Sequence, residues 1–336
     1  MPSRHPILVL LAALVVLTGC TSCGGGQTTP ITPPPVVTRP AFDRTKAFDA
    51  LTHQCSFGPR RPGSDGHEQC RAWLAAQLTA LADSVVLQNF SSKTPMGGPY
   101  DFQNIVGVFS AASTTTAGAP LLLAAHWDTR PIADQDPDPK NQATPILGAN
   151  DGASGVAVLL ELARLMKDRK PTRPVIIAFL DAEDSGINRT TTFPYLGFCI
   201  GANYLATHWP TDIGRPAEMV LLDMVGADNK RNARLQKPGQ IDGPAFLEEG
   251  YSMLSDPTLV ETIWSAAAPL GHSAFKRRSI DGIIDDEKPF IDNGIPGIDI
   301  IHFAPAEWHT IDDTPDNCSP DTLWQVGDTL VSVLWK

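Results

Sequence analysis

Acidic and imidazole side chains follow several apolar runs of this chain, at the points where the runs end. They are His126 and Asp128, after 121–125; Asp181, Glu183 and Asp184, after 175–180; Asp223, after 220–222; and His309, beyond 298–303. One such residue is usually a helix cap, a turn former or a surface group. Burying several of them without a cation would be costly. Because zinc binds imidazole nitrogen and carboxylate oxygen, the pattern predicts a zinc site.

Short β-branched and apolar runs alternate with helix-like segments, which predicts a single α/β/α sandwich around a central, largely parallel mixed sheet. The expected strands are 104–110, 121–128, 175–181, 219–226 and 297–303. The expected helices are 66–81, 152–167, 257–270 and 320–335. Open α/β sheets bind ligands outside the carboxyl ends of their strands. The polar groups should therefore converge on one crevice, although they lie far apart in the sequence.

Composition and charge exclude one class of partner. The chain has 336 residues, 42% of them hydrophobic, and a formal net charge of −11 with no basic run. Nucleic-acid binding needs clustered Lys and Arg, so we expect no nucleic acid as a partner. The sequence shows no repeats, needs no second domain and does not indicate an oligomeric state.

Residues 1–19 are typical of a secretory signal peptide. Arg4 and His5 precede an apolar run at 7–17 that is too short to span a bilayer. The ending Leu17-Thr18-Gly19-Cys20 resembles a bacterial lipobox, which implies cleavage before Cys20 and a lipid on its sulfur. The alternative is a plain signal peptide in which this Cys is coincidental.

The lipobox implies attachment to the cell envelope. Thr21, rather than Asp, follows the lipidated Cys, which favours the outer membrane, on its periplasmic side or surface. Residues 20–41 are rich in Gly, Thr and Pro and are expected to form a tether. The catalytic domain is then expected at 42–336.

Cysteines of an exported protein meet an oxidising compartment, so some are expected to pair. Cys55 and Cys70 flank the turn-rich stretch 57–63, and we expect a disulfide across it. Cys199 and Cys318 either pair or stay free, and the sequence does not decide between these states.

The order of the motifs resembles the zinc aminopeptidases and, more closely, the bacterial glutaminyl cyclases of the same fold. The shared motifs are HWD at 126–128, GANDGASG at 148–155, DAED at 181–184, Asp223, and WHT at 308–310. The cyclase-like stretches are HWDTRP at 126–131, DQDPDPKN at 134–141, FLDAEDSG at 179–186 and LLDMVG at 221–226. The resemblance covers most of residues 42–336. We expect Asp134, Asp136 and Asp138 to form turns, as Asp-Pro repeats usually do.

The resemblance implies roles for individual residues. Asp151, Asp184 and His309 would bind zinc, and Glu183 would be the general acid and base, with a pKa raised by its dry, acidic surroundings.

His126 and Asp223 match the ligands of a second zinc in the aminopeptidases. In the cyclases these positions hold no second metal, and Asp223 supports the substrate instead. Asp128 would orient His126; the alternative for Asp128 is a turn former at a strand end.

Two features favour a cyclase over an aminopeptidase. Asp285 matches the cyclase aspartate that holds the substrate amide, although 285–287 could also be a solvated acidic turn. Trp308 precedes His309, as in cyclases, where the indole packs on the glutamine side chain; the alternative is a core residue. Many cyclases of this group have a Trp near the position of Phe198, and Phe198 would substitute for it in substrate binding. Glu287 stands where a His is common.

The sequence therefore predicts a zinc-dependent glutaminyl-peptide cyclotransferase, which converts the N-terminal glutamine of peptides or proteins to pyroglutamate and releases ammonia. The alternative is an aminopeptidase with two zinc ions. A third alternative, an inactive binding protein, is disfavoured because every ligand position is filled. Since the family often has a cis peptide bond after the metal-binding aspartate, we also expect a cis Asp151–Gly152 bond.

Overall fold

The computed structural model of the protein describes residues 39–113, 118–187, 193–228 and 243–336. The predicted signal peptide, the lipidation site Cys20 and most of the predicted tether lie outside these residues. Within the described residues, no helix is both long and apolar enough to cross a membrane.

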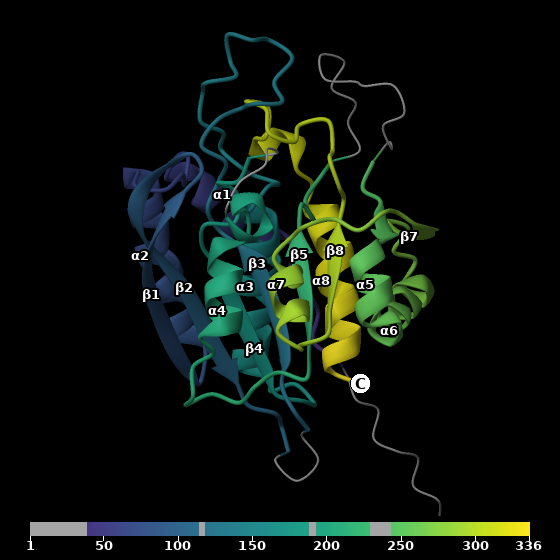
Figure 1. Cartoon of the computed structure of the whole chain (residues 1–336). Helices are drawn as coiled ribbons and strands as arrows, with labels where there is room; N and C mark the ends of the chain where they lie inside the picture. The colour runs from purple at the N-terminus through teal and green to yellow at the C-terminus, as the bar shows by residue number, and fades with distance from the viewer. Residues whose placement is uncertain (1–38, 114–117, 188–192, 229–242) are drawn as a thin grey trace, which may run out of the picture. The chain divides into compact units, whose positions relative to one another are not determined.

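A six-stranded mixed sheet forms the centre of the fold, in the order β1-β2-β4-β3-β5-β8. Its strands are β1 (Ser84–Thr94), β2 (Gly97–Phe109), β3 (Leu121–His126), β4 (Val175–Leu180), β5 (Glu218–Asp223) and β8 (Gly297–Ile301). The four strands β4, β3, β5 and β8 are parallel, whereas β2 pairs antiparallel with both β1 and β4. A separate two-stranded sheet joins β6 (Phe246–Glu248) and β7 (Phe275–Ser279). The predicted largely parallel mixed sheet is confirmed (Figure 1).

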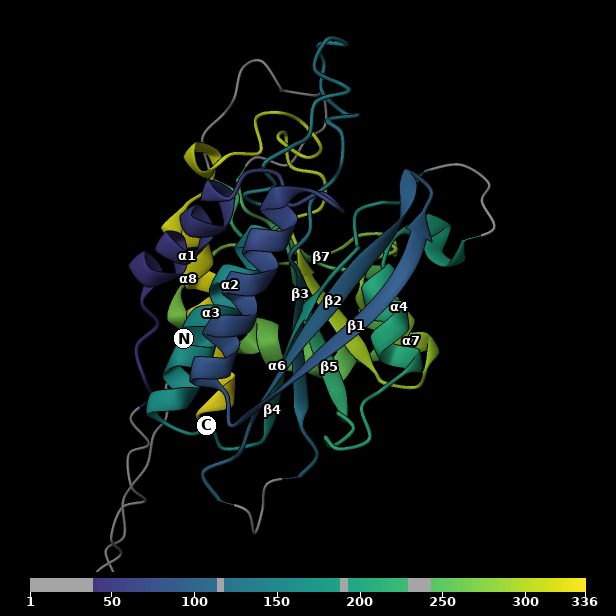
Figure 2. The same ribbon diagram turned by 90° about the vertical axis from the view of Figure 1, so that its left-hand side faces the viewer.

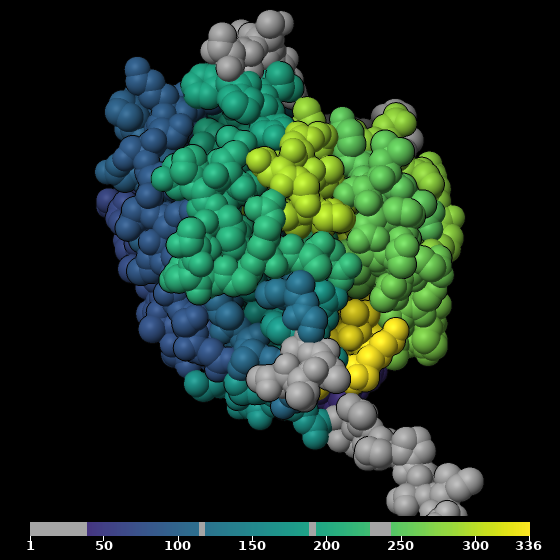
Figure 3. All heavy atoms as spheres, turned by 60° about the horizontal axis from the view of Figure 1, so that its bottom comes forward, coloured from purple at the N-terminus to yellow at the C-terminus, as the bar shows by residue number. Residues whose placement is uncertain are grey.

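Helices cover both faces of the sheet, as predicted (Figure 2). One face carries α1 (Arg44–Ser56), α2 (Asp65–Leu81), α3 (Ala153–Asp168), α6 (Pro257–Ala267) and α8 (Pro320–Leu334). The other face carries α4 (Ile200–Thr207) and α7 (Glu287–Asp292), with α5 (Gly250–Ser255) beside β8. Figure 3 shows segments of this second layer side by side, in teal-green, yellow-green and green. Single-turn helices occur at η1 (Pro194–Gly197), η2 (Ala268–Leu270) and η3 (Pro315–Asn317).

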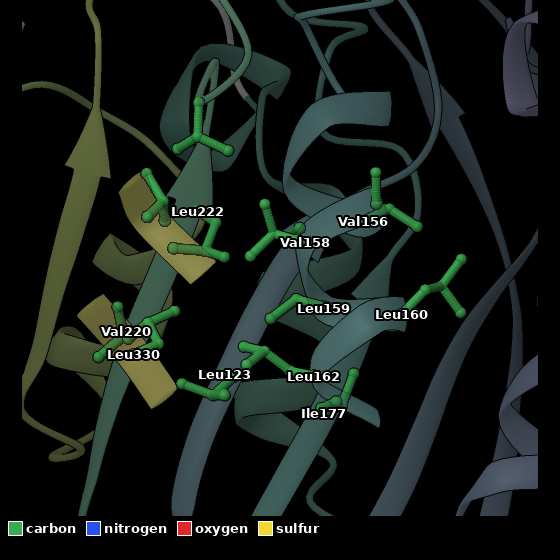
Figure 4. Close-up of a cluster of buried hydrophobic side chains, with 14 of the residues drawn as sticks. Leu123, Val156, Val158, Leu159, Leu160, Leu162, Ile177, Val220, Leu222 and Leu330 are labelled. Atoms are coloured by element: carbon green, nitrogen blue, oxygen red, sulfur yellow. The ribbon is translucent and has the colours of Figure 1, made fainter. Parts of the chain in front are cut away.

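The α3 helix packs at the centre of the larger core. Its Val158, Leu159 and Leu162 are fully buried with Leu123, Ile177 and other strand residues, and Leu330 of α8 joins them (Figure 4). Every residue of β3 and β4 is buried because helices cover both faces. Strands buried on both faces are continuous apolar runs, which is why the sequence shows them so clearly.

The parallel register brings the polar strand ends to one edge. His126 ends β3 and Asp223 ends β5, while Asp181 follows β4 directly. Strands β4 and β5 both pair with β3. These strand ends therefore lie together at the carboxyl edge of the sheet, where the site was expected.

Candidate active site

A cavity with a volume of about 810 Å³ lies at the carboxyl edge of the sheet. Its acidic and imidazole lining consists of Asp151, Glu183, Asp184, Asp223, Asp281, Asp285, His302 and His309. Its apolar lining includes Leu196, Phe198, Met224, Leu247, Phe303 and Trp308. The cavity thus gathers the residues predicted for zinc binding, for proton transfer and for substrate binding, from strand ends and loops that are distant in sequence.

Asp151 stands between two clusters of possible metal ligands. His309 Nε2 lies 3.6 Å from Asp151 Oδ2 and 3.5 Å from Asp184 Oδ1. His126 Nε2 lies 3.2 Å from Asp151 Oδ1 and 3.2 Å from Asp223 Oδ1. In each cluster the donor atoms lie within 4.8 Å of one another, and every member is buried. This donor set fits zinc, and the shared Asp151 allows one ion or two.

The loop that carries Asp151 is fixed by polar contacts. Asp313 accepts hydrogen bonds from the backbone N–H groups of Asn150, at 2.7 Å, and Asp151, at 3.1 Å. The Asn150 side chain accepts a hydrogen bond from the N–H of Gly226, after β5, at 2.7 Å. Neither Asp313 nor Asn150 was predicted to act on the site. Their role depends on contacts between distant loops.

The predicted cis Asp151–Gly152 bond is wrong. The cis bond found in the described residues is Gly98–Pro99. The chain turns after Asp151 through the backbone of Gly152 instead, whose φ of +99° is rarely adopted by residues with a side chain. A Cβ atom at Gly152 would lie 2.6 Å from the carbonyl oxygen of Asp128. Glycine is therefore needed here for its positive φ and for close backbone approach.

Asp128 contacts two neighbouring parts of the site. Its Oδ1 lies 3.5 Å from His126 Nδ1, at the position from which it was predicted to orient that ring. Its carboxylate also accepts hydrogen bonds from the backbone N–H groups of Glu183, at 2.9 Å, and Asp184, at 3.2 Å. Asp128 thus holds the backbone of the loop that carries Glu183, which sequence reasoning did not predict.

Glu183 is buried and lines the cavity. Burial, with the negative charges of Asp184 and Asp285, raises the pKa of Glu183 well above its ordinary value. A carboxyl group with a raised pKa can take up and return a proton near neutral pH. The environment therefore suits the predicted general acid and base.

The acidic segment 285–287 is buried, so the alternative of a solvated turn is excluded. Burial and the neighbouring Asp223 raise the pKa of Asp285 well above its ordinary value. Burial, with Asp128 and Asp223, raises the pKa of Asp286 to about 8. Asp285 lines the cavity, whereas Glu287 lies behind it and forms a third acidic cluster with Asp285 and Asp299.

Trp308 and Phe198 both line the cavity. The ring centroid of Trp308 lies 4.0 Å from that of His309. The indole therefore stands directly beside a possible metal ligand, and the alternative of a core residue is not supported. Both aromatic side chains lie where they could contact a substrate.

Comparison with known proteins identifies the family. The profile of Peptidase family M28 matches residues 104–334, which is more than half of the chain. The chain belongs to peptidase family M28.

Several members of this fold are similar to the chain over most of its length. The glutaminyl-peptide cyclotransferase-like protein of Bos taurus is 28% identical, over 82% of this chain and 71% of its own. The crystal structure of Bacteroides thetaiotaomicron glutaminyl cyclase bound to N-acetylhistamine is 35% identical, with a TM-score of 0.79, over 89% of this chain and 99% of its own. A Zn-dependent exopeptidase structure from Parabacteroides distasonis is 32% identical, with a TM-score of 0.79, over 89% of this chain and 100% of its own.

Two residues of this M28 chain that contact the possible zinc ligands were not predicted. Arg130 donates a hydrogen bond to Asp184, and Asp134 lies beside His309. Asp136 and Asp138 do form the expected turns, since each accepts a hydrogen bond from the backbone N–H two residues further on. Asp134 was expected to share that role, but its side chain faces the site instead.

The predicted Cys55–Cys70 disulfide is wrong, because both thiols are free and buried. Cys55 lies in the last turn of α1 and Cys70 lies in α2, and both belong to the larger apolar core. They pack there as small apolar side chains. Burial raises the pKa of Cys55 to about 11 and that of Cys70 to about 12. Cys199 and Cys318 are also free and buried.

Proposed function

We propose that this M28 chain is a zinc-dependent glutaminyl-peptide cyclotransferase. Its substrates would be peptides or proteins with an N-terminal glutamine, and its products pyroglutamate and ammonia. The observation that carries the proposal is the buried position of Asp285 on the cavity wall, beside Asp223 and close to Glu183. The similar glutaminyl cyclases support the same function.

Asp151, Asp184 and His309 are the proposed zinc ligands. Zinc bound there would act as a Lewis acid on the γ-carboxamide oxygen of the substrate. The chemistry of the donor set and the similar Zn-dependent exopeptidase support this metal.

Glu183 performs the proton transfer in the proposed reaction. Its carboxylate accepts a proton from the free α-amine, whose nitrogen attacks the γ-carbonyl carbon and forms the ring C–N bond. Glu183 then returns this proton to the amide nitrogen, which leaves as ammonia when its bond to the γ-carbon breaks. One C–N bond forms, one C–N bond breaks, one proton moves between the two nitrogens, and no water is consumed.

The surrounding residues orient the substrate. Asp223 and Asp285 accept hydrogen bonds from the amine and amide groups of the glutamine. Trp308 and Phe198 pack on its short side chain. The apolar part of the cavity limits water near the reacting carbonyl, which favours attack by the internal amine.

The alternative function, an aminopeptidase with two zinc ions, is supported by one observation. The second cluster, His126, Asp151 and Asp223, has geometry that can hold another ion. Zinc would then activate water for hydrolysis of the first peptide bond, with Glu183 as the base.

The attachment of the protein to the cell envelope is a separate proposal. It is supported by the lipobox-like sequence ending at Cys20, which would anchor the enzyme through a lipid. Replacement of Cys20 by Ser should release the protein from the membrane fraction or block its processing. Unchanged membrane attachment would contradict the proposal.

The deciding experiment compares peptides that begin with glutamine and with leucine. Ammonia and free amino acids are measured separately, together with the zinc content. A cyclase releases ammonia from the glutamine peptide alone, whereas release of free leucine indicates the aminopeptidase.

Glu183→Gln should keep its zinc but lose about 10²–10⁴-fold in kcat, because it removes the proton carrier. Near-normal turnover of this variant would contradict the role of Glu183.

A further inference from the structure

A buried ion pair connects two of the proposed zinc ligands. The Arg130 side chain is only 3% exposed and donates from Nε and Nη2 to both carboxylate oxygens of Asp134, at 2.9 and 2.8 Å. Its Nη1 donates to Asp184 Oδ1 at 3.0 Å. Asp134 Oδ1 in turn lies 3.2 Å from His309 Nδ1. One Arg–Asp pair thus contacts both ligands: Asp134 lies beside Nδ1 of His309, and Arg130 contacts Oδ1 of Asp184, the oxygen that lies 3.5 Å from His309 Nε2.

The pair is also fixed to the backbone on both sides. Arg130 Nη1 donates to the carbonyl oxygen of Gly186 at 3.1 Å. The N–H of Gln135, next to Asp134, donates to the carbonyl oxygen of His309 at 3.1 Å. The guanidinium also lies 5.5 Å from the ring centroid of Phe198. Neither side chain is therefore free to turn away from the site.

We propose that Arg130 and Asp134 are positioning residues that set the orientation of His309 and Asp184 as zinc ligands. This inference rests on the ligand set of the proposed function. The Asp134 carboxylate lies on the Nδ1 side of the ring, so Nε2 is the nitrogen that faces Asp151 and Asp184. Arg130 donates to Asp184 Oδ1, while Asp184 Oδ2 is buried and has no hydrogen-bond partner among the described residues. The arginine fork is needed because its three nitrogens contact two carboxylates at once.

The test measures zinc affinity, by competition with a fluorescent chelator, in Asp134→Asn, Arg130→Met and the double variant. Loss of such a partner usually weakens metal affinity about 10–100-fold, and we expect this in each single variant. The double variant should bind zinc about as weakly as the weaker single variant, because the two residues act as one unit. Arg130→Lys keeps the charge without the fork and should restore little of the affinity.

The matched control is Asp328→Asn. Asp328 also accepts hydrogen bonds from an arginine, Arg39, and lies 3.0 Å from His272, but it does not line the cavity. This variant should keep wild-type zinc affinity while its melting temperature falls.

Two outcomes would overturn the inference. One is zinc affinity within twofold of wild type in Asp134→Asn, whose side chain has nearly the same shape and whose folding is checked by a melt of the zinc-free protein. The other is loss of affinity in Asp328→Asn equal to that in Asp134→Asn. If Arg130→Met fails to fold, Asp134→Asn decides alone. Because zinc affinity is measured without substrate, a wild-type protein that binds zinc but releases no ammonia would contradict the cyclase function and leave this inference standing.

Discussion

Two Arg–Asp–His triads lie in the described part of the chain. At the cavity, Arg130 and His309 flank Asp134; between α8 and the segment before β7, Arg39 and His272 flank Asp328. Both aspartates accept two hydrogen bonds from their arginine. In residue types and pairing the two triads are nearly the same.

The difference lies in the second nitrogen of each histidine. Asp134 lies beside Nδ1 of His309, so Nε2 faces Asp151 and Asp184. Asp328 lies beside Nε2 of His272. Nδ1 of this histidine is buried and has no hydrogen-bond partner in the described part of the chain, and the ring meets Trp324 edge-on at a centroid distance of 4.6 Å. A histidine held by a carboxylate is therefore a candidate ligand only when its free nitrogen faces other donors.

The two arginines differ in burial as well. The Arg39 side chain is 36% exposed, whereas that of Arg130 is 3% exposed. An ion pair in water contributes little to stability, while removal of one partner of a buried pair is costly. We expect the cavity triad to control zinc binding and the remote triad to control only local stability.

The largest expected effect comes from the histidines themselves. His309→Ala should lose bound zinc and at least about a hundredfold in ammonia release, since loss of a ligand's partner alone can reach that scale. His272→Ala should keep its zinc and its activity and lose only stability. Zinc content and turnover are measured for both variants. Equal zinc content in the two would show that the ligand assignment is wrong.

Two glycines, one next to the proposed zinc ligand Asp151 and one next to His272, give a smaller effect. Gly152→Ala and Gly271→Ala both place a side chain at positive φ, +99° and +76° respectively. That conformation costs about 1–2 kcal/mol for an L-residue. Gly271 has open space around its Cβ position, whereas at Gly152 the Cβ would meet the carbonyl oxygen of Asp128.

We therefore expect Gly152→Ala to lose more unfolding free energy than Gly271→Ala and to bind zinc more weakly. Denaturant titration and chelator competition measure the two quantities. If both variants lose the same stability and keep their zinc affinity, close backbone approach at Gly152 does not position Asp151.

The smallest effect concerns how the stability of the zinc-free protein depends on pH. Asp286, beside the cavity, and Asp328, in the remote triad, should contribute with opposite signs. Asp286 has a folded-state pKa of about 8, above the unfolded value of about 3.9. Its contribution to the free energy of unfolding is therefore full below about pH 4 and declines as the pH rises toward 8. The pKa of Asp328 is lowered: burial alone would raise it, but the hydrogen bonds from His272 and Arg39 outweigh burial. Its contribution is present above about pH 4 and is lost only in acid.

Melting temperatures of the zinc-free protein between pH 5 and 8 test these signs. Asp286→Asn should make the decline over this range shallower. Asp328→Asn should lower the melting temperature by a similar amount at both ends of the range. An unchanged slope in Asp286→Asn would mean that this carboxyl group does not titrate in the range.

The predictable part of the fold was the part buried on both sides. Strands β3, β4, β5 and β8 are nearly continuous apolar runs, and the expected strands and helices all occur. Strand β1 was not predicted, because its polar and half-exposed residues form no apolar run. Helix α1 was also missed, since only Ala47, Leu51, Gln54 and Cys55 of its residues are buried.

In the site, residues at strand ends could be located from the sequence, because parallel strands end at one edge. Arg130 and Asp134 could not be located in this way. Their contacts exist because the loop after β3 folds back onto His309, far along the chain. The disulfide was wrong for a related reason: sequence spacing does not show where two thiols point.

The four buried cysteines have a practical consequence for following how this molecule opens. Burial raises the pKa of each thiol, so almost none is in the reactive thiolate form at neutral pH. Cys55, Cys70 and Cys318 belong to the larger core under α1, α2, α3 and α8, and Cys199 belongs to the smaller core under α4, so their alkylation needs local opening of these cores. The rates of labelling at these positions thus time the opening of the two cores separately. Labelling of the native cysteines therefore reports the opening of each core without an added probe.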